Sequence, residues 1–274
     1  MSLVRRSSTL FLILGALMAF CNILPLAIFL LWLGFIQVFN ALAIGLPFER
    51  AVHWLHAMTF EPLACFGVFV LRFCPLKESH VGDKQPILLV HGYGDHKNVW
   101  VVQKKRLENL GLGPIYTIDF GNPFRSIHHY AEKLKDKVEF IAKETNRSDL
   151  TLIGHSMGGL VCSLYATKLA PGNTVTDLIT IASPLLGTPL AKIAIGDDAR
   201  EMEPDSDFIK NLRQAMQENR STRFYHIATK CDQIVIPGDT AATLDHEHVI
   251  YKDLGHVSLL YSGRVAKQIH KWLT

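Results

Sequence analysis

From Lys84 to the C-terminus, short apolar runs alternate with longer amphipathic stretches, and this alternation is the feature that most limits the fold. The expected strands are "PILLVHG" (86–92), "IYTIDF" (115–120), "LTLIGH" (150–155), "VTDLITIAS" (175–183), "TRFYHIATK" (222–230) and "HVIYKDL" (248–254). The expected helices cover residues 126–145, 158–170 and 257–273. Strands that alternate with helices in this way predict an α/β fold with a mostly parallel sheet and helices on both faces.

One serine stands where an expected strand becomes an expected helix. The stretch "LTLIGHSMGGLVCSLYA" (150–166) contains Gly154-His155-Ser156-Met157-Gly158, a G-x-S-x-G pattern in the strand-turn-helix context that makes it meaningful. The glycines are expected because a Cβ at either position would collide with the neighbouring strand and helix. The following helix would direct free N–H groups and a positive dipole end at this corner. Ser156 is therefore the candidate nucleophile.

A serine hydroxyl needs a base, and the base needs an orienting acid. On sheets of this kind the chain order is serine, then acid, then histidine, each in a loop after a strand. Asp232 follows one expected strand in "KCDQIVIP", and His256 follows the last one in "DLGHVSLL". Both would lie at the carboxyl edge of the sheet together with Ser156. We therefore assign His256 as the base and Asp232 as the acid.

Other acids and histidines are available in the same part of the chain. Asp239 and Asp253 are alternative acids, and His246 and His248 in "LDHEH" are alternative bases. The two histidines precede the last expected strand, which is the wrong edge of the sheet, and we expect them to be solvated. The pattern "DHEH" lacks the spacing of a catalytic zinc site.

The developing oxyanion needs two hydrogen-bond donors. The backbone N–H of Met157, directly after the serine, is one expected donor. The second should come from "HGYGDHKNVW" after the first expected strand, and we assign it to the backbone N–H of Tyr93. A purely structural loop or a phosphate cradle are the alternatives for this segment, but no G-K-[ST] follows it.

Together these segments resemble the α/β-hydrolase family, and within it the small bacterial-type lipases and esterases. The resemblance rests on "VHGYGD", "LIGHSMGGL", "IASPLLGTPLA", "CDQIVIP" and "LGHVSLL", which occur in family order between about residues 85 and 273. "REMEPDSDFIKNL" (200–212) also looks like a segment of lipase-type members. The resemblance implies ester hydrolysis through an acyl-enzyme, with Ser156, His256 and Asp232 as triad and Tyr93 and Met157 as oxyanion donors. Such chemistry requires no metal and no organic cofactor.

Three other functions remain open at this point. A thioesterase or an acyltransferase would use the same triad, because the acyl-enzyme step is common to all of them and only the acceptor differs. A catalytically dead, membrane-anchored binding protein on a hydrolase fold is the non-enzymatic alternative. It is disfavoured because nucleophile, acid and base can all be assigned.

The N-terminal part differs from the rest of the chain. No charged residue occurs from Ser7 to Pro47, which is long enough for two short membrane spans separated at residues 22–25. A cleaved signal peptide would have a shorter apolar core, so we expect a membrane anchor. Arg5 and Arg6 favour a cytoplasmic N-terminus, and Arg50 mildly favours a hairpin, but the side of the catalytic domain stays open. The stretch 51–77 could be a third span or an interfacial helix pair.

We accordingly divide the chain into membrane-anchoring helices (1–80) and a catalytic domain (81–274). The formal net charge is only +3 and the basic residues are dispersed, so nothing indicates a nucleic-acid partner. Residues 183–222 leave room for only a small lid. An open site beside a membrane favours an amphiphilic acyl ester, such as a glyceride or a phospholipid, as substrate.

Overall fold

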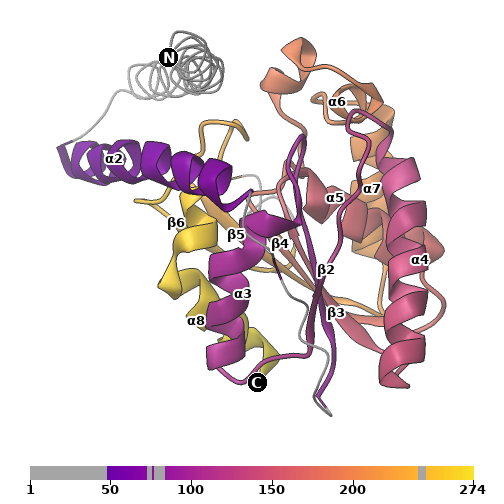
Figure 1. Ribbon diagram of the computed structural model, residues 1–274. Coiled ribbons are helices and arrows are strands. Elements are labelled where there is room, and N and C mark those ends of the chain that lie inside the picture. The colour runs from indigo at the N-terminus through magenta and orange to yellow at the C-terminus, as the bar shows by residue number, and fades with distance from the viewer. Residues whose placement is uncertain (1–47, 73–75, 77–83, 240–244) are drawn as a thin grey trace, which may run out of the picture. The chain divides into compact units, whose positions relative to one another are not determined.

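The computed structural model (Figure 1) describes residues 48–72, 76, 84–239 and 245–274. The chain from Pro47 to Thr274 clusters as one compact unit. The predicted membrane-anchoring segment 7–47 lies outside the described residues. The division of the chain at 80/81 stays a prediction.

Six parallel strands form the sheet of this unit, as the alternation of apolar and amphipathic segments predicted. They are β1 (Ile87–Val90), β2 (Ile115–Thr117), β3 (Leu150–His155), β4 (Val175–Ile181), β5 (Arg223–Thr229) and β6 (Glu247–Tyr251). Their order is β2-β1-β3-β4-β5-β6, and every pairing between them is parallel. β3 has the bounds that were predicted, and each of the other five strands is shorter than the run that predicted it, because the remaining residues form the loops at the strand ends.

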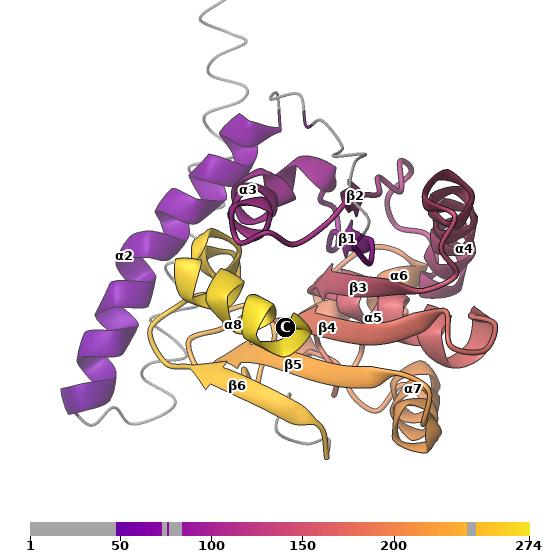
Figure 2. The same ribbon diagram turned by 90° about the horizontal axis from the view of Figure 1, so that it is seen from below.

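Helices cover both faces of the sheet, as Figure 2 shows from below. On one face lie α4 (Ile127–Thr145), α5 (Met157–Leu164) and α7 (Asp207–Glu218), and on the other lie α3 (Val101–Asn109) and α8 (Gly263–Leu273). A hydrophobic core lies on each face of the sheet, and successive strand residues point into the two cores alternately. Leu88 packs on the α4 side and Leu89 on the α8 side. The strands are therefore apolar at nearly every position, which is why they read as continuous hydrophobic runs.

Two of the predicted helices have different ends from those expected. The helix after Ser156 changes to a wider π-type turn at Tyr165–Leu169, before Pro171. The closing helix is interrupted: residues 258–261 form a short 3-10 helix, extended Ser262 follows, and α8 begins at Gly263. The helix at 126–145 is confirmed, with Ser126 accepting a hydrogen bond from the N–H of His129 at its N-cap.

The predicted third span or helix pair at 51–77 was wrong. Residues 48–71 form one continuous helix, α2 (Phe48–Leu71). None of the helices in the described parts of the chain is both long enough and apolar enough to cross a membrane. Instead, α2 belongs to the compact unit and buries Ala57, Glu61 and Ala64.

Candidate active site

Ser156 occupies the turn between β3 and α5 in a strained backbone conformation. Its φ and ψ are 54° and −128°, values that non-glycine residues rarely adopt. The turn is held by a hydrogen bond from the N–H of Ser156 to the carbonyl of Ile181 (2.8 Å). The sequence predicted a serine at a sharp strand-to-helix corner, and this is where the structure places it.

The two glycines of the pattern are required by close backbone contacts. A Cβ on Gly154 would lie 2.5 Å from the backbone of Gly158, in the first turn of α5. A Cβ on Gly158 would lie 2.5 Å from the carbonyl oxygens of Val90 and His91, at the end of β1. Contacts this short with backbone atoms cannot be relieved by turning a side chain. The expected role of the glycines is confirmed.

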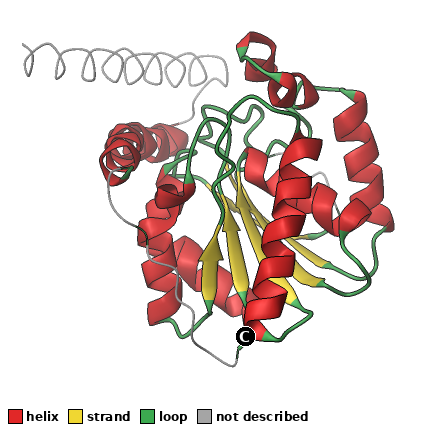
Figure 3. Cartoon of the chain, turned by 45° about the vertical axis from the view of Figure 1, so that its right-hand side comes forward, coloured by secondary structure: helices red, strands yellow, loops and turns green. Residues whose placement is uncertain are grey.

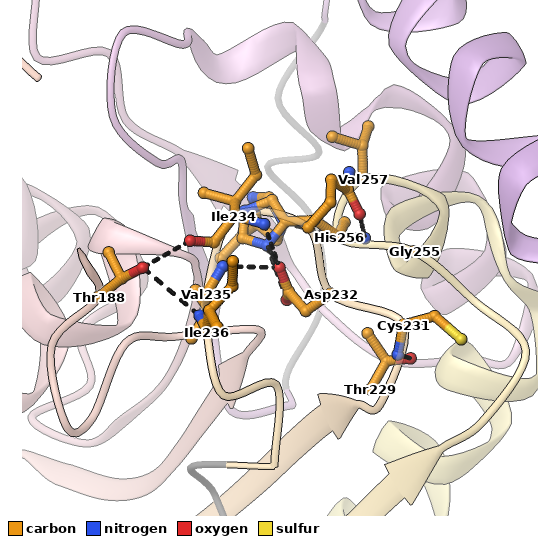
Figure 4. Close-up of polar contacts among 12 residues, drawn as sticks. Thr188, Thr229, Cys231, Asp232, Ile234, Val235, Ile236, Gly255, His256 and Val257 are labelled. Carbon is orange, nitrogen blue, oxygen red and sulfur yellow. Dashed lines mark hydrogen bonds and ion pairs between the residues drawn. The ribbon is translucent and has the colours of Figure 1, made fainter. Parts of the chain in front are cut away.

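Asp232 and His256 form a buried pair beyond the ends of β5 and β6. Nδ1 of His256 lies 2.9 Å from Oδ2 and 3.0 Å from Oδ1 of Asp232 (Figure 4). Oδ1 of Asp232 also accepts hydrogen bonds from the N–H groups of Ile234 (2.9 Å) and Val235 (2.7 Å). With Nδ1–H donating to the carboxylate, Nε2 carries the lone pair, which is the tautomer that a general base needs.

The loop that carries Asp232 is itself fixed to the rest of the molecule. Thr188 donates its hydroxyl to the carbonyl of Ile234 (2.6 Å) and accepts from the N–H of Ile236 (3.4 Å), as Figure 4 shows. A Cβ on Gly238 would lie 2.2 Å from the carbonyl oxygen of Thr229, so the loop returns close to the end of β5. The Asp232 carboxylate is therefore held by its own loop and not only by the histidine.

The residues next to Ser156 contact both neighbouring loops. His155 donates from Nε2 to the carbonyl of His256 (3.1 Å), and the two rings are 4.7 Å apart. On the other side, a Cβ on Gly92 would lie 2.9 Å from the Cβ of Ser156. The carboxyl ends of β1, β3, β5 and β6 thus meet at one edge of the sheet, where Figure 3 shows the loops crowded beyond the strands.

The two expected oxyanion donors lie on either side of this turn. Met157 is the first residue of α5, so its N–H is one of those that the helix itself leaves without a partner. Tyr93 follows Gly92, and its side chain points elsewhere: its hydroxyl donates to the carbonyl of Ile195 (2.6 Å) and accepts from the N–H of Ile195 (3.1 Å). The side chain of Tyr93 thus ties the loop after β1 to the segment before α6 (Asp197–Glu201).

The electrostatic surroundings of His256 favour its charged form. Burial alone lowers its pKa, but the Asp232 carboxylate opposes this through its charge and hydrogen bond, and Glu61 and Asp95 add to the effect, so the net pKa is raised. Asp95 is itself affected, because burial raises its pKa to about 7. In contrast, burial and the neighbouring His256 hold the pKa of His155 well below its usual value, so His155 is a neutral hydrogen-bond donor.

The alternative acids and bases have other partners or positions. Asp253 pairs with Arg264 (2.6 Å), and Asp239 is exposed in the loop after Asp232. His248 is exposed, as expected. His246 is not simply solvated, which corrects the prediction: it is half-buried and its Nδ1 lies 3.0 Å from Nε2 of His226.

Sequence reasoning missed a second carboxylate near His256. Glu61 of α2 is completely buried and accepts hydrogen bonds from the N–H groups of Val257 (2.6 Å) and Ser258 (2.8 Å). Its one sequence signal is that it is the single acid of the largely apolar stretch 51–71. That signal alone does not identify the partner, which lies 196 positions away along the chain.

The fold and the buried Asp-His pair define an α/β hydrolase, and comparison with known proteins agrees. The family model described as "Alpha/beta hydrolase family" matches residues 87–229, about half of the chain. The chain therefore belongs to the α/β-hydrolase family.

Several curated relatives match part of the chain. Ethanol acetyltransferase 1 of Cyberlindnera fabianii is 26% identical over 152 residues, covering 52% of this chain and 45% of that protein. Monoacylglycerol lipase abhd6-B of Xenopus laevis is 28% identical over 124 residues, covering 42% of this chain and 36% of that protein. The chain matches less than half the length of each of these relatives.

Solved structures share the fold. The lipase BlEst2 of Bacillus licheniformis in its mature form aligns with a TM-score of 0.59 and 18% identity, covering 73% of this chain and 96% of that one. The monoacylglycerol lipase of Paleococcus ferrophilus aligns with a TM-score of 0.55 and 16% identity, covering 69% and 95%. At such identities the likeness establishes the architecture and not the activity.

Proposed function

We propose that the chain is a serine hydrolase that cleaves acyl esters through an acyl-enzyme. Ser156 is the nucleophile, His256 the general base and Asp232 the group that orients it. The observation that carries this proposal is the buried Asp232–His256 pair, whose loops meet the turn of Ser156 at one edge of the sheet. A monoacylglycerol lipase among the curated relatives supports the same chemistry.

The proposed reaction begins with proton transfer from the Ser156 hydroxyl to Nε2 of His256. The hydroxyl oxygen attacks the ester carbonyl, and the alcohol leaves with that proton, which yields an acyl-serine. Water, deprotonated by the same imidazole, then cleaves the acyl-serine and restores the enzyme. The imidazolium formed in each step is stabilised by the Asp232 carboxylate, which Ile234 and Val235 hold in place.

The oxyanion formed in both steps would be bound by the backbone N–H groups of Tyr93 and Met157. The first lies in the loop against Ser156, and the second belongs to the first turn of α5. A helix N-terminus adds a positive dipole end at this point. Removing one such donor costs about 2.7–4 kcal/mol of transition-state stabilisation in hydrolases where this has been measured.

A fluorophosphonate probe tests the nucleophile directly, because it phosphonylates an activated serine. We expect the wild-type chain to be labelled and Ser156→Ala not to be labelled. Ser163→Ala is the matched control, since Ser163 lies within α5 and donates its hydroxyl to the carbonyl of Gly159 (2.8 Å). Labelling that persists in Ser156→Ala would refute the assignment.

An apolar rim beside Tyr93 supports an amphiphilic substrate. Ile193 and Ile195 are 75% and 71% exposed, and Phe124 is exposed beside the Tyr93 ring, with ring centroids 5.5 Å apart. Three exposed apolar side chains near the loop that would bind the oxyanion are suited to an acyl chain or a lipid surface. We propose a substrate of the glyceride or phospholipid type.

Turnover of p-nitrophenyl esters against acyl length tests this substrate class. We expect medium or long acyl chains to be preferred over acetyl, and Ile195→Ser to reduce that preference. Lys192→Ser, in the same segment, is the control for a general effect of substitution. Activity confined to acetyl esters would contradict a lipid substrate.

Acyl transfer to an alcohol is a second candidate, because several curated relatives are named ethanol acetyltransferase. Transfer differs only in the second step, where an alcohol replaces water as the acceptor. Product analysis in the presence of ethanol separates the two. Ethyl ester formed at the expense of free acid favours transfer, whereas free acid alone favours hydrolysis.

We further propose that the chain is bound to a membrane through residues 7–47. The support is the absence of charge in that stretch and the exposed apolar residues Leu55, Leu63 and Phe66 on α2. Alkaline carbonate washing of isolated membranes tests it. A chain that stays in the membrane pellet supports anchoring, and complete release into the supernatant contradicts it.

A further inference from the structure

Glu61 is a buried carboxylate that contacts the loop of His256 from a distant helix. It lies near the middle of α2 and is 0% exposed. Oε1 accepts from the N–H of Val257, and Oε2 accepts from the N–H of Ser258. The side-chain amide of Gln233 donates a short hydrogen bond to Oε1. Burial raises the pKa of Glu61, and these three donors, together with the nearby His256, favour the ionised carboxylate and oppose that rise in part.

These contacts involve three consecutive N–H groups of the histidine loop. The carbonyl oxygen of the Gln233 side chain accepts from the N–H of His256 itself (3.2 Å), while Glu61 accepts from the next two. Gln233 is also the residue after Asp232 in the chain. Glu61 and Gln233 therefore hold the backbone that carries the imidazole, while Asp232 binds the imidazole itself.

The loop is shaped to admit this carboxylate. A Cβ on Gly255 would lie 2.3 Å from Oε2 and 2.5 Å from Cδ of Glu61. The Ser258 hydroxyl accepts from the N–H of Gly255 (2.7 Å) and so closes the turn around the same point. A glycine is thus needed beside His256 because α2 fills the space that a side chain would take.

Both halves of α2 are attached to the edge of the sheet where the site lies. His56, one and a half turns before Glu61, has its Nδ1 2.8 Å from the carbonyl of Asp253, in the approach to the histidine loop. At the other end, the side-chain amide of Asn98 donates to the carbonyls of Leu71 (3.1 Å) and Arg72 (3.0 Å). Asn98 follows the loop of Tyr93. Helix α2 therefore connects the loop of His256 with the loop of Tyr93, the expected oxyanion donor.

We propose that Glu61 is a positioning residue of the active site, which holds the loop of His256 in its catalytic geometry and makes α2 part of the catalytic unit. This inference rests on the proposed function, because it gives His256 the role of the base. Glu61 acts through backbone N–H groups and through Gln233, and it does not touch the reacting atoms.

The charge of Glu61 provides a second, measurable consequence. The groups that face His256 are Asp232 from the loop after β5, Asp95 from the loop after β1, His155 from β3 and Glu61 from α2. The three carboxylates raise the pKa of the imidazole. Removing the charge of Glu61 lowers that pKa, so the base stays unprotonated to a lower pH. The acidic limb of kcat/KM must then move toward lower pH.

Glu61→Gln tests the proposal in the full-length chain. The amide is isosteric, but it carries no charge and presents an NH2 group to one of the two backbone donors. We expect kcat to fall by roughly 10- to 100-fold with little change in KM, because a small displacement of a catalytic group has effects of this size. The acidic limb of kcat/KM should move to lower pH. Glu132→Gln, on the exposed side of α4, is the control and should match the wild type.

Active-site titration with the fluorophosphonate probe separates positioning from a merely structural role. A Glu61→Gln enzyme that melts at a lower temperature, but keeps the wild-type kcat per titrated site and the wild-type acidic limb, overturns the proposal. Ser156→Ala is assayed in parallel. If it is as active as the wild type, the proposed function fails, whereas an inactive Ser156→Ala with a fully active Glu61→Gln rejects only the role of Glu61.

Gln233→Met decides the question if Glu61→Gln cannot be recovered folded. This substitution keeps both backbone bonds of Glu61 and removes only the link from Glu61 to the N–H of His256. We expect about a 10-fold loss of kcat with an acidic limb close to that of the wild type, because the charge remains. An unchanged kcat in this variant overturns the proposal.

Discussion

Two regions converge on the imidazole of His256, and they differ in how the chain specifies them. The loops after β3, β5 and β6 bring Ser156, Asp232 and His256 to one edge of the sheet, as connections between parallel strands do. Helix α2 reaches the loop of His256 from outside the sheet, through one carboxylate in the middle of the helix. The loop region follows from topology, whereas the helix region depends on contacts between residues that lie far apart in the sequence.

Asp232 and Glu61, the carboxylates of these two regions, show what this difference means. Asp232 is bound by the N–H groups of its own loop, so the motif that contains it also positions it. Glu61 is bound by the N–H groups of the loop it supports, so its position depends on docking of the whole helix. Substitutions in the first region should therefore affect chemistry most strongly, and substitutions in the second should affect geometry and stability.

The largest effect is expected from His256→Ala. Without the imidazole nothing accepts the proton of Ser156, and we expect kcat to fall by about 10⁵- to 10⁶-fold, as in serine hydrolases where a triad member was removed. Ester hydrolysis under saturating substrate is the measurement. His248→Ala is the matched control, because His248 is exposed and contacts the carbonyl of His246. Full activity of His256→Ala would show that another residue is the general base.

Asp232→Asn should have the next largest effect on turnover. The amide keeps the volume of the carboxylate, but it favours the wrong tautomer of His256, and the corresponding change in a serine protease lowers kcat about 10⁴-fold. The same assay measures it, with Asp239→Asn as the control because Asp239 is exposed in the same loop. If Asp239→Asn lowers kcat more than Asp232→Asn does, Asp239 and not Asp232 is the acid that orients His256.

Much of the loop region could be predicted from the sequence because its constraints are local. A glycine-flanked serine between an apolar run and a helical pattern has few alternatives to a sharp strand-to-helix turn. The positions of Asp232 and His256 follow from the rule that loops after parallel strands share an edge. The strand ends were less predictable, because β2 stops at Thr117 while the apolar pattern continues to Phe120.

Gly158→Ala tests the close packing on which the loop region depends. The added Cβ would lie 2.5 Å from two backbone carbonyl oxygens, so strands and helix must separate. We expect a loss of about 1–3 kcal/mol in the free energy of unfolding, measured by denaturant titration. Gly263→Ala is the matched control: a Cβ there meets nothing within 4 Å, and the change should be neutral or slightly stabilising. Equal effects in the two variants would contradict the packing argument.

The docking of α2 could not be predicted because its amphipathic pattern is weak. Its exposed face carries Leu63 and Phe66, and its buried face carries Ala57 and Glu61, which reverses the usual arrangement of apolar and polar residues. A periodicity argument therefore favours a membrane-associated helix, as was expected for 51–77. Glu61 can be buried on this face because the loop of His256 supplies N–H donors to its carboxylate. No local sequence pattern encodes that contact.

The smallest effect is expected on the outer face of α2. Leu63 is 61% exposed, so Leu63→Ser removes little packing and should change the free energy of unfolding by no more than about 0.5 kcal/mol. Cys65→Ser, two residues further on, places a hydroxyl in a buried position and should cost about 1–3 kcal/mol. Thermal unfolding of the two full-length variants in the same detergent compares the faces. If Leu63→Ser destabilises as much as Cys65→Ser, the outer face is covered in the folded protein, and α2 is held from both sides rather than from the catalytic side alone.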